Sequence, residues 1–124
     1  MKKIFVSFDV DDRFARDDLV HQAQKHGAPF EFLDIPVKNP WDFSWKAKCH
    51  ERIKGCHGVI ALVSDNTFDA GGARWEIQCA YEERLPVLPL YVDGHGASRI
   101  PPELRGKKIY RWTWDNVKQF IDRL

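Results

Sequence analysis

The chain has 124 residues, which is enough for one compact domain and leaves no room for a second core. Its composition is 44% hydrophobic and 13% aromatic, so it can bury a core, and general disorder is excluded. The formal net charge is +1, with acidic and basic residues mixed along the sequence rather than clustered as in a nucleic-acid or membrane-surface binder. We expect a single domain over residues 1–124, with neither nucleic acid nor membrane as a partner.

The sequence also predicts a compartment. No apolar run approaches the roughly 20 residues of a membrane span, and the run after the basic start is too short for a signal peptide. Cys49, Cys56 and Cys79 are odd in number, and their spacing does not indicate a disulfide framework. We expect three reduced thiols in a cytoplasmic protein.

Residues 4–8 are apolar and β-rich, which predicts a first strand. A helix then begins at residues 11–13, because acidic residues in a first turn suit the positive end of the helix dipole. Its apolar stripe is expected to be Phe14, Leu19, Val20 and Ala23. Gly27 ends this helix, and residues 30–33 form a short second strand.

The next segment, residues 34–43, is long for a loop in an α/β protein and contains Pro36. Loops of this kind often carry function, so it is a candidate functional element. Residues 44–54 follow as a second helix, with either Ser44 or Asp42 as its cap.

Residues 58–63 are a continuous apolar run, which is typical of a central parallel strand buried on both faces. A third helix is predicted over residues 73–84, a fourth strand over 87–92 and an edge strand over 108–112. Asp115 is the expected cap of a last helix. The inner face of that helix consists of Val117, Phe120, Ile121 and Leu124.

The alternation of strands and helices predicts a parallel sheet with helices on both faces. For five strands the expected solution is a flavodoxin-like three-layer α/β sandwich with strand order 2-1-3-4-5. Ligands bind such sheets at the carboxyl ends of the strands, near the switch between strands one and three. This geometry predicts a crevice lined by residues 8–12, the loop over 34–43 and residues 64–67.

Several segments resemble one known family. Residues 3–8, followed by the acidic pair at 11–12, resemble the opening of Toll/interleukin-receptor (TIR) domains. Residues 59–67 resemble the third TIR strand and the loop after it. The sequence Ala-Arg-Trp-Glu-Ile over residues 73–77 resembles the helix of compact bacterial TIR-like proteins, and residues 87–92 fit the same pattern. The resemblance extends over nearly the whole chain.

The most similar group is the TIR-like proteins of the Thoeris anti-phage type. The resemblance implies that NAD is consumed to make a small nucleotide signal, which activates a separate effector protein, and that TIR domains associate with one another. In catalytic TIR domains a single glutamate on the third helix is essential, and by position it is Glu76. The loop after the second strand, although long for an α/β connection, is short and differently composed beside that of the adaptor TIR domains of animals, which argues against receptor-adaptor signalling.

One carboxylate suits the chemistry of this reaction. Nicotinamide leaves NAD as a neutral molecule, and the positive charge that develops on the ribose can be stabilised by a nearby carboxylate. On a helical wheel Glu76 lies at the edge of the stripe formed by Ala73, Ile77, Ala80 and Tyr81. Spacing alone also allows a solvated surface glutamate, and it is the resemblance that favours the catalytic role.

Other polar and aromatic residues fall near the predicted crevice. The expected substrate-binding residues are Ser7, Phe8, Asp9, Asp11, Trp45, Ser64 and Asn66. Phe8 can stack on an aromatic ring of the substrate or belong to the core. Asp9 and Asp11 can bind ribose or cap a helix, and Trp45 can wall an adenine pocket or serve packing alone.

Two kinds of cofactor site are disfavoured. The pairs Cys49-His50 and Cys56-His57 match no common zinc spacing, so no metal is expected. Residues 9–12 replace the glycines that a dinucleotide fingerprint needs after the first strand. NAD is therefore expected as a substrate and not as a retained cofactor.

Three alternatives remain open. A non-catalytic TIR module would act through TIR–TIR assembly, with Trp75 as a contact candidate. A phosphoacceptor receiver domain could use Ser64-Asp65, although residues 112–114 lack the lysine such domains need. A nucleoside deoxyribosyltransferase also pairs a glutamate with a ribose on a similar sheet.

Overall fold

The computed structural model describes residues 1–28, 30–35 and 38–124; Pro36 of the predicted loop lies outside these ranges. Five parallel strands form one sheet in the order β2-β1-β3-β4-β5. The strands are β1 (Lys2–Ser7), β2 (Phe30–Leu33), β3 (Gly58–Val63), β4 (Val87–Tyr91) and β5 (Tyr110–Arg111). The predicted flavodoxin-like order is therefore confirmed.

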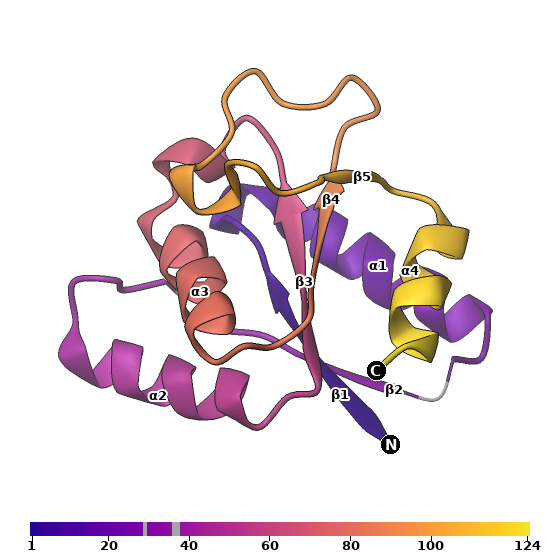
Figure 1. Ribbon diagram of the computed structural model, residues 1–124, viewed down its shortest axis with the longest axis horizontal. Helices are drawn as coiled ribbons and strands as arrows, with labels where there is room; N and C mark the ends of the chain where they lie inside the picture. The colour runs from indigo at the N-terminus through magenta and orange to yellow at the C-terminus, as the bar shows by residue number, and fades with distance from the viewer. Residues whose placement is uncertain (29, 36–37) are drawn as a thin grey trace.

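Helices cover both faces of the sheet, giving three layers (Figure 1). The α-helices are α1 (Arg13–Lys25), α2 (Phe43–Lys54), α3 (Gly71–Glu82) and α4 (Trp114–Asp122). Short 3₁₀ turns are η1 (Val10–Asp12), η2 (Thr67–Asp69) and η3 (Pro102–Leu104). Helices α1 and α4 pack on one face, and α2 and α3 pack on the other. Within the described ranges, no helix is both long and apolar enough to cross a membrane.

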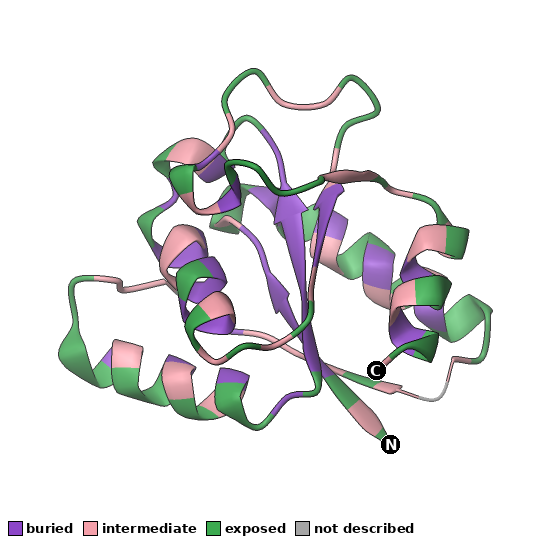
Figure 2. Cartoon of the chain, viewed as in Figure 1, coloured by how far each residue is buried: buried purple, intermediate pink, exposed green. Residues whose placement is uncertain are grey.

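The central strands carry the core. Every residue of β3 is buried, as the apolar run predicted, and Figure 2 shows this strand enclosed between the helical layers. Along β1 the side chains alternate: Ile4 and Val6 pack with α1 and α4, whereas Phe5 packs with α2 and α3. Ser7 therefore faces the layer of α3, at the carboxyl end of β1.

The structure decides two helix caps that the sequence left open or placed wrongly. Asp42 caps α2, because its carboxylate accepts bonds from the amides of Ser44 and Trp45. Helix α4 is capped by Thr113 and not by Asp115, since the Thr113 hydroxyl accepts a bond of 3.1 Å from the Asn116 amide. Asp115 instead lies in the first turn, where its charge faces the helix dipole.

The predicted stripe of α1 is also wrong at one position. Phe14 is 59% exposed, whereas Ala15, Leu19 and Ala23 are buried. The buried residues follow an i, i+4 spacing, and Phe14 lies one residue before Ala15, off that stripe.

Candidate active site

Helix α3 carries the glutamate toward the sheet. Small residues occupy most of its inner face and let the helix backbone approach the strands closely. The buried residues of α3 are Gly72, Ala73, Glu76, Ile77, Cys79 and Ala80. Glu76 is 0% exposed, so it lies within the buried stripe rather than at its edge.

The Glu76 carboxylate has polar partners from three other segments. Ser7 Oγ, at the end of β1, lies 2.9 Å from Glu76 Oε1 and 3.2 Å from the carbonyl oxygen of Ala73. Lys38 Nζ donates to Glu76 Oε2 at 2.9 Å and to Oε1 at 3.1 Å. Cys49 Sγ of α2 lies 3.8 Å from Oε2. A buried charge is tolerated only with partners of this kind.

Burial and hydrogen bonding act in opposite directions on this carboxylate. Burial raises the pKa of Glu76 from 4.5 to about 7, although the ammonium of Lys38 and the bonds from Lys38, Ser7 and Cys49 lower it. Burial, with the Glu76 charge nearby, also raises the pKa of the Cys49 thiol. Cys49 is therefore a neutral donor at this site and not a thiolate nucleophile.

Lys38 closes the site from the side of the loop that follows β2. Its side chain is only 7% exposed, and Nζ also lies 4.5 Å from the centre of the Phe8 ring. A β-carbon added to Gly72 would lie 2.6 Å from Lys38 Cβ. The first turn of α3 thus accepts the lysine only because residue 72 has no side chain. In this conformation the carboxylate is sealed from solvent.

A second polar network lies at the same edge of the sheet, where β1 and β3 end. Asp12 is buried and accepts bonds from Ser64 Oγ at 2.5 Å and from Asn66 Nδ2 at 3.0 Å. The Ser64 amide in turn donates to Thr67 Oγ1 at 2.9 Å. This network ties η1 to the segment after β3 and fixes the two strand ends at the switch point.

The predicted substrate-binding residues are divided between these surroundings. Ser7 forms a hydrogen bond with Glu76 directly. Ser64 and Asn66 belong to the Asp12 network, with Asn66 exposed at the surface. Phe8 is fully buried in the core shared with α1 and α4, and meets the site only through its contact with Lys38.

The remaining predicted residues have partners in other parts of the fold. Asp9 caps η1 by accepting a bond from the amide of Asp11, and Asp11 itself is exposed. Trp45 is buried beneath α3 and packs edge-on against Trp75, with ring centres 5.5 Å apart. The Trp45–Trp75 contact therefore joins α2 to α3.

Sequence reasoning missed Lys38, Cys49 and Asp12 as members of these networks. From the sequence, Cys49 is expected as a reduced thiol and is disfavoured as a metal ligand, but it is not expected as a partner of Glu76. The described residues contain no group of three His, Cys, Asp or Glu side chains that could hold a metal ion. Asp12 is expected from the sequence either to bind ribose or to cap a helix, and not to join two strand ends. Lys38 carried no local signal, since a single lysine in a loop is ordinary.

Comparison with known proteins agrees with this architecture. A family model described as TIR domain matches residues 4–124. The TIR domains in the structure of the activated Roq1 resistosome directly recognizing the pathogen effector XopQ superpose with a TM-score of 0.56 and 14% sequence identity, covering 99% of this chain and 70% of that chain. At this identity the likeness concerns the fold alone. No curated protein matches the chain. With nearly its whole length matched by the family model, the chain belongs to the TIR domain family.

Proposed function

We propose that this TIR domain cleaves the bond between nicotinamide and ribose in NAD, with Glu76 as the catalytic residue. The observation that carries the proposal is the position of the Glu76 carboxylate: fully buried, bonded to the last residue of β1, beside the switch between β1 and β3. Open parallel sheets bind their ligands at this kind of switch point. A carboxylate held there can face the ribose of a bound dinucleotide.

The proposed reaction needs one carboxylate. The bond between ribose C1′ and the nicotinamide nitrogen breaks, both bonding electrons pass to the ring nitrogen, and neutral nicotinamide leaves. Ionised Glu76 stabilises the resulting oxocarbenium charge in a site of low dielectric constant. Water then attacks C1′ and loses a proton to give ADP-ribose, or a group of the same nucleotide attacks and closes a ring.

Access to Glu76 requires a rearrangement in this scheme. Both oxygens of the Glu76 carboxylate accept hydrogen bonds from Lys38, and the Glu76 side chain has no exposed surface. NAD therefore reaches Glu76 only after Lys38 has left, while Ser7 stays to hold the carboxylate from the strand side. Asp11 and Asn66 are both exposed at this edge. Asp11 is proposed to accept hydrogen bonds from the ribose hydroxyls and Asn66 to bind the sugar or phosphate groups, with Asp9 and Ser64 close by in sequence.

The proposed biological role is the production of a nucleotide signal. By its likeness to the Thoeris type, the chain would release an ADP-ribose derivative, linear or cyclic, in the cytoplasm of an infected cell. That product would act on a separate effector protein in anti-phage defence, and NAD would be consumed as a substrate.

The decisive experiment compares two glutamates of one helix. Purified protein is incubated at high concentration with NAD, and nicotinamide and nucleotide products are followed by chromatography and mass spectrometry. Glu76→Gln is expected to abolish nicotinamide release. Glu82→Gln, an exposed position of α3, is the matched control and should leave release unchanged. Undiminished turnover in folded Glu76→Gln protein would reject the assignment.

One observation favours a second candidate function, a non-catalytic module that works through TIR–TIR assembly. Trp41 and Phe43 are 79% and 85% exposed beside the start of α2, and the Lys38–Glu76 pair could serve as a purely structural lock. For this function, Trp41→Ser and Phe43→Ser would abolish concentration-dependent assembly in light scattering. NAD would remain intact at every protein concentration, including those at which the domain assembles.

A further inference from the structure

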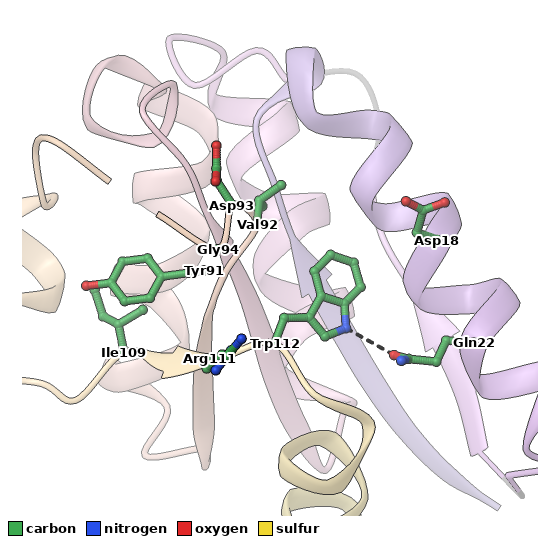
Figure 3. A pocket seen from close by; sticks show the side chains of 9 residues that line it. All are labelled: Asp18, Gln22, Tyr91, Val92, Asp93, Gly94, Ile109, Arg111 and Trp112. Carbon is green, nitrogen blue, oxygen red and sulfur yellow. Dashed lines mark hydrogen bonds between the residues drawn. The ribbon is translucent and has the colours of Figure 1, made fainter. Parts of the chain in front are cut away.

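A cavity of about 830 Å³ opens at the carboxyl ends of β4 and β5. Strands β4 and β5 pair only briefly, and Tyr91–Arg111 is the last pair. Beyond it the chains diverge, one toward the loop at Asp93 and the other toward α4, and the cavity lies between them. Helix α1 closes the far wall with Asp18 and Gln22 (Figure 3). This volume falls within the usual range for small-ligand sites.

This cavity is separate from the site around Glu76. Its wall includes α1, and its residues Val92 and Trp112 pack against the core that α1 and α4 share. Glu76 belongs to α3 and lies on the other face of the sheet. Neither Glu76 nor Lys38 lines the cavity.

The lining combines one fixed aromatic surface with charged groups. The indole of Trp112 is held in place because its Nε1 donates to Gln22 Oε1 at 3.0 Å, as Figure 3 shows. Asp93 and Asp18 contribute carboxylates from the two sides of Trp112, and Arg111 of β5 contributes a guanidinium group. The Asp93 carboxylate is itself oriented by a bond of 2.9 Å from the His95 amide.

We propose that this cavity binds a nucleoside. An indole face accepts any base by stacking, and such stacking contributes about 1–3 kcal/mol per base. A carboxylate accepts hydrogen bonds from the hydroxyl groups of a ribose, as it does in dinucleotide-binding sheets. Because the lining carries two carboxylates and one guanidinium, it repels a polyphosphate and favours an uncharged nucleoside over the corresponding triphosphate. The inference goes beyond the proposed NAD cleavage and does not depend on it.

The test measures adenosine and ATP binding to the whole chain by isothermal titration calorimetry and saturation-transfer NMR. Adenosine should bind saturably and more tightly than ATP. Asp93→Asn and Trp112→Leu should each weaken adenosine binding by about tenfold. The matched controls Asp115→Asn and Trp41→Leu, both at exposed positions outside the cavity, should change it by less than about twofold.

Two further measurements keep the outcome clear. Asp93 is exposed and asparagine retains the acceptor for the His95 amide, so Asp93→Asn should fold even if thermal unfolding shows Trp112→Leu to be damaged. Glu76→Gln should leave adenosine affinity unchanged, which separates this cavity from the proposed catalytic site. Absent binding, tighter binding of ATP, or loss of binding in Glu76→Gln but not in Asp93→Asn would overturn the proposal.

Discussion

The Lys38 side chain crosses the first turn of α3 over Gly72, so closely that a β-carbon at residue 72 would lie 2.6 Å from Lys38 Cβ and 3.0 Å from its Cγ. The ion pair between Lys38 and Glu76 therefore depends on a glycine that contacts neither carboxylate oxygen. A substitution at Gly72 can therefore disturb the closed site without changing either charged group.

Gly72→Ala is expected to drive Lys38 away from Glu76. The added methyl group cannot share the space with Lys38 Cβ, and displacing the loop side chain costs about 1–3 kcal/mol of overpacking. If the closed conformation limits NAD access, nicotinamide release by the isolated domain should rise several-fold. Gly55→Ala is the control, since a β-carbon there would meet only ordinary contacts at 3.6 Å or more. Equal rates for both variants and the parent would show that Lys38 does not gate the reaction.

Glu76 should make folding stability depend on pH in a defined window. Its pKa is about 7 in the folded chain and close to 4.5 in the unfolded chain, so the folded state binds the extra proton between these values. The stability contributed by Glu76 is complete below pH 4.5 and falls by about 3 kcal/mol as pH rises to 7. Urea unfolding of the parent and of Glu76→Gln between pH 4.5 and 8 measures the difference. If the unfolding free energy of the parent, relative to that of Glu76→Gln, rose with pH instead of falling, the raised pKa would be contradicted.

The fold was accessible to sequence reasoning because its signals are local. The run of residues 58–63 is apolar at every position, and only a strand covered on both faces needs such a pattern. The site was accessible only in part. Ser7 can be named from its place at a strand end. Glu76 is named by the family resemblance, because the helix period alone also allows a solvated glutamate.

Lys38 could not be found in the same way. It lies 38 residues from Glu76 in sequence, and its placement depends on the packing of a loop against Gly72. The burial of Glu76 was underestimated for a related reason. The helical wheel gives only a direction, whereas the depth of the helix depends on the small residues that bring α3 close to the sheet. Thr113 is the cap instead of Asp115 because the backbone enters the helix two residues earlier than predicted.

Ser7→Ala tests whether the strand side of the site positions the carboxylate. The change removes the hydroxyl that lies 2.9 Å from Glu76 Oε1 and leaves Lys38 in place. We expect a loss of about 1 kcal/mol of stability and a decrease of about tenfold in nicotinamide release, because the carboxylate is then held less firmly against the ribose. Ser44→Ala, at an exposed position of α2, serves as the comparison. If Ser7 positions the carboxylate, kcat should fall in Ser7→Ala with little change in KM. A change in KM alone would contradict the positioning role.

The Asp12 carboxylate should contribute more to the free energy of unfolding than its place in an acidic helix start indicates. Its buried carboxylate accepts bonds from Ser64 and Asn66, so Asp12→Ala leaves two donors after β3 without their acceptor. We expect this variant to lose about 2–3 kcal/mol of unfolding free energy, whereas exposed Asp11→Ala should change it by less than about 0.5 kcal/mol. Asp12→Asn keeps one acceptor oxygen and should fall between them. Urea denaturation of the three variants gives the order directly, and equal midpoints for Asp12→Ala and Asp11→Ala would mean that the network does not hold the ends of β1 and β3 together.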